Sequence, residues 1–274
     1  MANLEPQFHG TPRFRIVSRI GVGTVGEIYK ALDETRGSFV ALRTLRNASL
    51  GGEALRREFR ALRNVRHPSL VSLGELDCVD GLWFYTMEFV EGESLLDYVR
   101  PRAKAGSTPR PGVGGMPGEL SEVRLRSVLS QLVRGISALH QAGRVHGNLE
   151  PDHIRVTPQG RLVLLECELS GSRDSTDSDQ HWLSSLPFVA PERLEDARPS
   201  PATDWYSLGA VLYQALSSAA PFQTSGADLV EQKQTVAPKL PVGIKAPEDL
   251  CALCEDLLAL DPDARPDADE IRQS

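Results

Sequence analysis

The sequence lacks the features that mark several broad classes of protein. None of its apolar runs is long enough to span a bilayer, and its first residues show no signal-peptide pattern. Its 30 basic residues are fewer than its 37 acidic ones, and the formal charge of −7 argues against nucleic acid as the main partner. We therefore expect no membrane contact and no nucleic-acid contact from this chain.

Cysteine is also scarce, with four residues in 274. We expect no disulfide framework, and a reducing, cytoplasmic setting is the default. The spacing of Cys251 and Cys254 occurs in zinc and redox sites. However, both lie in residues 248–260, where apolar residues recur at helical spacing, and no second cysteine pair accompanies them. We predict a buried and a half-buried thiol on a helix, without a metal.

The apolar pattern changes along the chain from strands to helices. We predict strands over residues 14–20, 27–31, 39–45, 73–78 and 83–87, with one helix over 53–65. After Gly92 the pattern becomes helical, and Gly143 is placed as a helix stop. Residues 205–216 are apolar nearly all round, as in a buried central helix. One predicted helix face contains Leu125, Val128, Leu129, Leu132, Ile136 and Leu139. The pattern indicates an α+β fold with a small antiparallel sheet and a larger, mainly helical part.

Two segments show no periodicity. Residues 1–11 are interpreted as an unstructured lead-in. Residues 101–118 are rich in proline, glycine and basic residues, which predicts a flexible surface insertion. The remaining residues, 12–274, are interpreted as one domain.

Short motifs follow one another in a fixed order. The glycine pattern at Gly21, Gly23 and Gly26 is weak evidence alone, because a turn between strands also uses the backbone freedom of glycine. The accompanying motifs are VALR at residues 40–43, RHPSLV at 66–71, TMEFVEG at 86–92, APE at 190–192 and DWYSLG at 204–209. Together they resemble the Ser/Thr protein kinase family, its bacterial eukaryotic-like branch in particular, over about residues 14–271.

The resemblance implies a two-lobed protein kinase fold. The N-lobe would cover about residues 12–87, the hinge 88–92 and the C-lobe 93–274. Structural roles fall to Glu58, His146, Glu192, Asp204 and Arg265, with Glu58 paired to Arg43 and Glu192 to Arg265. Positions that would contact a nucleotide, if one binds, are Gly21, Val22, Gly23, Gly26, Ile28, Ala41, Arg43, Met87, Glu88, Val90 and Arg155.

The catalytic loop at residues 146–153 departs from the family. Asn148 replaces the catalytic aspartate, and an amide cannot accept a hydroxyl proton as a carboxylate does. Glu150 replaces the lysine that faces the transferring phosphate, which reverses a charge beside an anion. His153 replaces the metal-binding asparagine, although magnesium prefers oxygen ligands. These positions are predicted to be incompetent for ordinary phosphoryl transfer.

Further degenerate positions follow. Glu166 stands at the metal-binding aspartate of the D-F-G motif, and Glu168 replaces its glycine and adds a second negative charge. Arg43 replaces the lysine of the third strand. It keeps the positive charge, but its planar guanidinium group does not substitute for an ammonium at a crowded phosphate. We expect no bound metal.

Arg155 stands where the family places an apolar side chain under the adenine ring. Strand alternation puts it on the same face as His153, towards the cleft. A cation there has to be solvated or paired, and Glu88, Glu166 and Glu168 are candidate partners. We expect an occluded or weakened pocket. In the alternative, Arg155 extends outward and leaves the adenine slot usable.

Three functions remain open from the sequence. The first is a pseudokinase, a protein-binding or allosteric signalling module without ordinary phosphoryl transfer, with weak or no nucleotide binding and no cofactor. The second is a Ser/Thr kinase of unusual ATP-dependent mechanism, with Mg or Mn at Glu166 and phosphate at Arg43. The third is a sensor that binds a small ligand in the former nucleotide cleft. We expect a protein partner, and a longer parent protein could carry a membrane or sensor segment.

Overall fold

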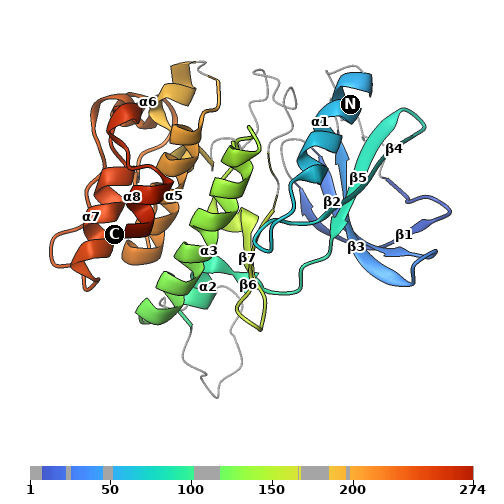
Figure 1. Cartoon of the computed structure of the whole chain (residues 1–274), viewed down its shortest axis with the longest axis horizontal. Coiled ribbons are helices and arrows are strands. Elements are labelled where there is room, and N and C mark those ends of the chain that lie inside the picture. Colours follow the sequence, from blue (N-terminus) through green and yellow to red (C-terminus); the bar gives the residue numbers. More distant parts are fainter. Residues whose placement is uncertain are drawn as a thin grey trace. The chain divides into compact units, whose positions relative to one another are not determined.

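The chain separates into two compact units (Figure 1). Of the described residues, the first unit takes those up to Arg66 and Val71–Val90, and the second unit takes the rest. The computed structural model describes residues 8–22, 26–45, 52–101, 118–165, 167, 185–195 and 198–273. The insertion predicted over residues 101–118 lies, apart from its two end residues, outside the described residues.

The first unit is built on a five-stranded antiparallel sheet, in the order β1-β2-β3-β5-β4. All five strands predicted from the alternating pattern are present, each longer by one or two residues. Asp80 and Gly81 both adopt positive φ and form the two-residue turn between the last two strands. The strands are β1 (Phe14–Val22), β2 (Glu27–Asp33), β3 (Ser38–Leu45), β4 (Leu73–Val79) and β5 (Leu82–Glu88).

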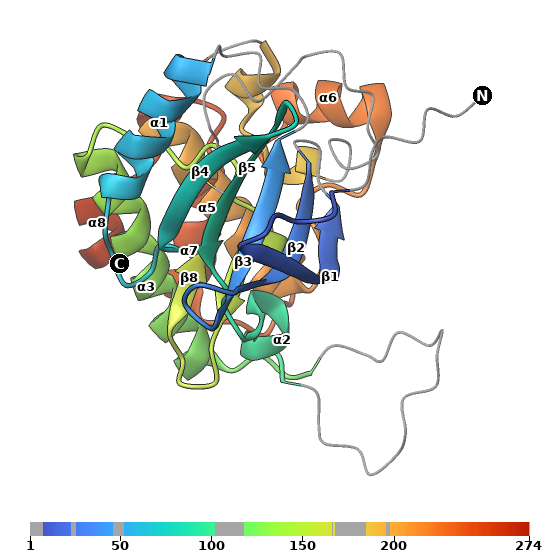
Figure 2. The same cartoon turned by 90° about the vertical axis from the view of Figure 1, so that its right-hand side faces the viewer.

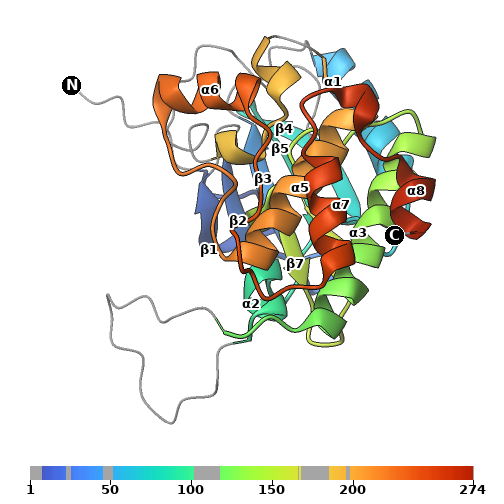
Figure 3. The same ribbon diagram turned by 90° about the vertical axis from the view of Figure 1, so that its left-hand side faces the viewer.

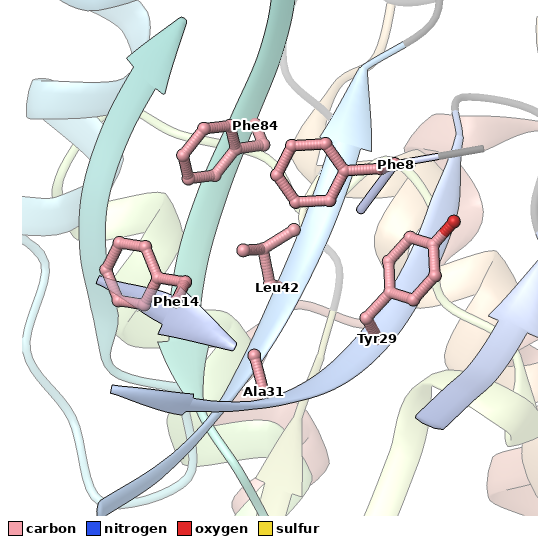
Figure 4. Packing of buried hydrophobic residues seen from close by; sticks show 6 residues of the cluster. All are labelled: Phe8, Phe14, Tyr29, Ala31, Leu42 and Phe84. Atoms are coloured by element: carbon pink, nitrogen blue, oxygen red, sulfur yellow. The ribbon is translucent and has the colours of Figure 1, made fainter. Parts of the chain in front are cut away.

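One face of this sheet carries an aromatic cluster (Figure 4). The ring of Phe8 lies 5.2 Å from that of Phe84 and 6.1 Å from that of Tyr29. The other buried members are Phe14, Ala31 and Leu42. The expectation of an unstructured lead-in over residues 1–11 is therefore wrong for its last residues. A single aromatic among polar neighbours gives no periodic signal, although burying it stabilises the fold.

The opposite face of the sheet packs against helix α1 (Gly52–Asn64), which Figure 2 shows beside β4. Leu55, Phe59 and Leu62 are buried at the spacing of one helix face. The ring of Phe59 lies 5.6 Å from that of Tyr85, the neighbour of Phe84 on β5. Since neighbouring residues of a strand point to opposite faces, α1 and the aromatic cluster lie on different sides of the sheet.

The second unit is mainly helical, as predicted. Its small antiparallel sheet has the order β6-β7-β8, with β6 (Glu93–Ser94), β7 (Ile154–Val156) and β8 (Leu162–Leu164). Figure 3 shows α5 beside α7. The helices are α2 (Leu95–Val99), α3 (Glu122–Gln141), α5 (Pro201–Ser217), α6 (Gly226–Thr235), α7 (Glu248–Leu257) and α8 (Ala268–Gln273). Short 3-10 turns are η1 (Pro151–His153), η2 (Leu186–Phe188), η3 (Pro191–Glu195) and η4 (Pro262–Ala264).

Helix α5 is the centre of this unit. Gly209 lets α7 approach, because a Cβ at this position would lie 2.7 Å from the Cβ of Leu257. The predicted apolar face of α3 is buried throughout, and Gly143 follows α3 at φ 66. The helix predicted over residues 248–260 ends at Leu257 instead. Among the described residues, no helix is long and apolar enough to cross a membrane.

Candidate functional site

The loop of residues 146–153 is held by its main chain from helix α5. Asp204 is almost completely buried, and its Oδ1 accepts a hydrogen bond from Gly147 N at 2.9 Å. Its Oδ2 accepts from His146 N and from His140 Nε2, both at 2.8 Å. A buried carboxylate needs such donors, so the loop and the helix stabilise each other. Asp204 therefore fixes the start of the loop.

His146 connects the loop to the segment that follows β8. Its ring is fully buried, and Nε2 donates to the carbonyl of Leu165 at 2.9 Å. Because a carbonyl only accepts, Nε2 carries the proton, and Nδ1 is free to accept from Asn148 N at 3.4 Å. Gly147, between them, adopts φ 71, a left-handed conformation that favours glycine. The loop has lost the arginine that the family places there, and its backbone suits the replacement.

The side chains of Glu150 and His153 lie next to each other within the loop. Both are 6% exposed, and Glu150 Oε1 lies 3.2 Å from His153 Nε2. His153 Nδ1 lies 2.8 Å from the carbonyl oxygen of Asn148 and therefore donates to it. The two replaced positions thus form a close, buried pair inside the loop.

This pairing bears on metal binding. The asparagine that His153 replaces would offer an oxygen, whereas both nitrogens of His153 are engaged within the loop. Magnesium prefers oxygen ligands and retains its waters, so the residues present at this position do not fit it. Among the described residues, no group of His, Cys, Asp or Glu side chains could hold a metal ion. The second candidate ligand, Glu166, lies outside the described residues.

Arg155 lies at the centre of β7, opposite Ser94 of β6 and Val163 of β8. It is half-buried, and its side chain makes no hydrogen bond or ion pair with another described residue. Two predicted partners, Glu166 and Glu168, lie outside the described residues, so the pairing stays a prediction. The short strand predicted at Ile154–Val156 is present as β7, and His153, the last residue of η1, directly precedes it. The expected common direction of His153 and Arg155 stays a prediction.

In the first unit, several predicted nucleotide positions share one face of the sheet. Ile28 pairs with Arg43 across β2 and β3, and Ala41 pairs with Met87 across β3 and β5. Ala41 and Arg43 are two residues apart on one strand, so all four side chains are on the same side. Arg43 is buried. Val22, Glu88 and Val90 are partly exposed, Glu58 is half-buried on α1, and the pairing of Glu58 with Arg43 stays a prediction.

The glycine pattern has a structural reason at one position. A Cβ on Gly26 would lie 1.9 Å from the carbonyl oxygen of Thr44, so only glycine permits this approach of β3. Gly21 pairs with Ile28 and has ordinary room for a Cβ. Gly23 lies outside the described residues. Retention of Gly26 is thus explained by backbone packing without a phosphate.

Arg265 and Glu192 form the predicted ion pair. The guanidinium binds the carboxylate with both terminal nitrogens, at 2.7 and 2.8 Å. Its remaining donors bind the carbonyl oxygens of Ala202, Ala259 and Leu260. The side chain of Arg265 is fully buried, and the pair joins η3 to the segment that follows η4.

Sequence reasoning missed Lys233, which is fully buried on α6. Its ammonium donates to Tyr206 Oη at 3.1 Å and to the carbonyl of Pro187 at 3.2 Å. Burial lowers the pKa of Lys233 to about 7. A lysine in an otherwise mixed helix is normally exposed, so sequence alone offers no signal for this position.

Known proteins resemble this chain over nearly its whole length. Serine/threonine-protein kinase PknA of Mycobacterium tuberculosis (strain ATCC 25618 / H37Rv) is 27% identical over 264 residues, which cover 92% of this chain and 58% of the relative. PknE of the same strain is 25% identical over 282 residues, covering 94% and 47%. The chain thus spans about half the length of these curated relatives.

A solved structure supports the fold. The crystal structure of Rad53 1-466 in complex with AMP-PNP matches with a TM-score of 0.75 and 22% identity, covering 94% of this chain and 64% of that one. The family model described as protein kinase domain matches residues 14–274. The α+β, two-lobed architecture expected from the motifs is therefore confirmed. The chain belongs to the protein kinase domain family.

Proposed function

We propose that this chain is a pseudokinase, a cytoplasmic protein-binding or allosteric signalling module. In this proposal ordinary phosphoryl transfer is lost and nucleotide binding is weak or absent. The observation that carries the proposal is the buried pair of Glu150 and His153. These residues stand where a Ser/Thr kinase would place a cation for the phosphate and an oxygen ligand for the metal.

The chemistry of phosphoryl transfer explains why this pair matters. Catalysis depends on positioning, on metal ions and cations that neutralise the phosphates, and on a base near the attacking hydroxyl. Glu150 supplies a carboxyl group instead of a cation, and its oxygen is engaged by His153. Asn148 supplies an amide instead of a base. None of these tasks is matched by the residues present at the two positions.

One observation favours the alternative, a Ser/Thr kinase of unusual ATP-dependent mechanism. The face formed by Ile28, Ala41, Arg43 and Met87 keeps the family's arrangement, with a buried cation at the third-strand position. Phosphoryl transfer has a largely dissociative transition state, so the absence of a base does not by itself abolish it. Under this alternative ATP would bind with Mg or Mn.

A thermal-shift titration with ATP, with and without Mg or Mn, tests the proposal. A ligand at about a hundred times its Kd adds about 2.7 kcal/mol to the stability of the folded state, which is a clear shift. We expect no shift at millimolar nucleotide. The variant Arg155→Leu is the matched probe of the adenine position, and a shift gained only in this variant would identify Arg155 as the block.

A phosphotransfer assay with radiolabelled ATP and a general protein substrate completes the test. We expect no metal-dependent transfer from the wild type. Transfer that disappears in Arg43→Met would overturn the proposal in favour of the unusual kinase. If ATP binds but no phosphate is transferred, the proposed loss of catalysis stands and only the proposed weak nucleotide binding is wrong.

A further inference from the structure

Helix α1 and the residues after it present a group of exposed basic side chains, which we call the arginine face. None of them forms an ion pair with a carboxylate of a described residue. The arginine face consists of Arg56, Arg57, Arg60, Arg63 and Arg66.

Three exposed arginines elsewhere in the chain are paired with carboxylates. Arg15 pairs with Glu34 at 2.6 Å, and Arg126 binds Asp249 and Glu122. Arg272 pairs with Asp269 at 2.6 Å. Acidic residues outnumber basic ones in the sequence, so the lack of such pairs on α1 does not follow from a shortage of carboxylates.

Three members of the arginine face form a stripe. Arg56, Arg60 and Arg63 are separated by four and three residues, so they lie on one side of the helix. At the rise of an α-helix this stripe is about 10 Å long. The guanidinium of Arg56 lies 5.1 Å from the ring of Trp83, which anchors one end of it.

The neighbouring strand β4 does not neutralise the stripe. Asp77 pairs with Phe84, whose ring belongs to the aromatic cluster on the far face of the sheet. Glu75 binds Arg13 at 2.8 Å and Arg36 at 3.3 Å. The carboxylates of β4 thus form no ion pair with the stripe.

The stripe carries an unfavourable energy within the folded chain. Like charges three or four residues apart repel each other along a helix. Arg56 also lies near the helix N-terminus, where the dipole disfavours cations. No ion pair among the described residues offsets these terms, whereas an external anion would.

We infer that the arginine face binds a carboxylate-rich segment of a partner protein. This inference rests on the proposed function, since a binding module needs a docking surface. A run of acidic residues matches the stripe in charge and can match its length of about 10 Å, which an extended segment spans in about three residues.

Two other anionic partners fit less well. The formal charge of −7 repels a nucleic acid polyanion from most of the molecule. A membrane surface would require apolar side chains beside the basic ones, but the large apolar residues of α1, Leu55, Phe59 and Leu62, are buried.

Fluorescence anisotropy with a labelled peptide of alternating glutamate and serine tests the inference, with glutamine replacing glutamate in the control peptide. The test variant is Arg56→Gln, Arg60→Gln, Arg63→Gln, because glutamine keeps the helix propensity. The matched control, Arg15→Gln, Arg126→Gln, Arg272→Gln, removes the same charge from exposed positions elsewhere. We expect the test variant to bind about tenfold more weakly, as for three lost exposed ion pairs, and the control to bind like the wild type.

Equal weakening in both variants would overturn the inference, because net charge alone would then explain binding. Tighter arginine-dependent binding of duplex DNA or of phosphatidylserine vesicles than of the peptide would overturn the choice of partner. Circular dichroism of both variants verifies that α1 still folds. The phosphotransfer assay separates the two proposals. If the wild type transfers phosphate and also binds the peptide through its arginines, only the pseudokinase function is refuted.

Discussion

The carboxyl group of Glu150 lies 3.2 Å from Nε2 of the His153 imidazole, inside the loop that precedes β7. Both side chains are almost fully buried, so each is a polar neighbour of the other away from water. The two positions are therefore expected to tolerate change together rather than separately.

A double-mutant cycle tests this coupling. Glu150→Lys should destabilise the fold by about 2–4 kcal/mol, because it places a buried ammonium beside the ring, and His153→Asn should do so by leaving the carboxylate without its partner. The double variant restores the family's residues. Its loss of stability should be smaller than the sum of the two single losses by at least about 1 kcal/mol. Urea unfolding gives the three free energies, and simple additivity would contradict the coupling.

Asp204→Asn should destabilise the second unit by about 2–4 kcal/mol. The amide can present only one oxygen to the main-chain donors of His146 and Gly147, which now bind both carboxylate oxygens. Asp228→Asn, at an exposed position of α6, is the matched control and should change little. Urea unfolding followed by circular dichroism measures both. Equal stabilities of the two variants would show that the loop is not anchored at Asp204.

Glu192→Ala should cost about 3–5 kcal/mol, because it leaves the buried guanidinium of Arg265 without its counter-charge. Arg265→Lys should not recover the wild-type stability, since a single ammonium cannot replace the two-pronged contact. Arg272→Ala removes an exposed pair and should cost no more than about 1 kcal/mol. Denaturant midpoints rank the three variants, and a small loss in Glu192→Ala would contradict the importance of the buried pair.

Lys233 should make stability depend on pH. Its pKa is about 7 in the folded chain, against 10.5 as the ordinary value. Between these values the unfolded chain binds more protons, so the free energy of unfolding rises with pH there. Below about pH 7 the folded state carries the full penalty of a buried charge.

The variant Lys233→Met should remove this contribution. Its stability relative to the wild type should be greatest below about pH 7 and fall by about 1 kcal/mol per pH unit above it. Urea unfolding across this range measures the difference, with Lys239→Met as the exposed control. A stability difference that stays constant with pH would show that Lys233 does not titrate in this window.

Local periodicity accounts for what could be predicted from the sequence. Strand alternation located β1 to β5, and a helical apolar repeat located α3, because each pattern spans many residues. The strands β6 and β8 have two and three residues, too few to show an alternation. Phe8 was missed for a related reason, since the residues that it packs against are distant in sequence.

The candidate site could be predicted in its positions but not in its contacts. The motifs located Glu150 and His153 and identified both as departures from the family. Their contact depends on the tight turn of η1, which brings the two side chains together and which no apolar pattern encodes. Lys233 is a similar case, because its burial depends on Tyr206 and Phe222 rather than on its own helix.

Asp204 holds the loop by two amide groups of the main chain. Every residue except proline offers such an amide, so the two hydrogen bonds need no particular side chain, although the φ of 71° at Gly147 favours glycine. A kinase-domain loop anchored in this way can exchange its catalytic side chains while the path of its main chain is kept. The same anchor makes the loop a starting point for design, because new side chains can be introduced on a main chain whose path is already set.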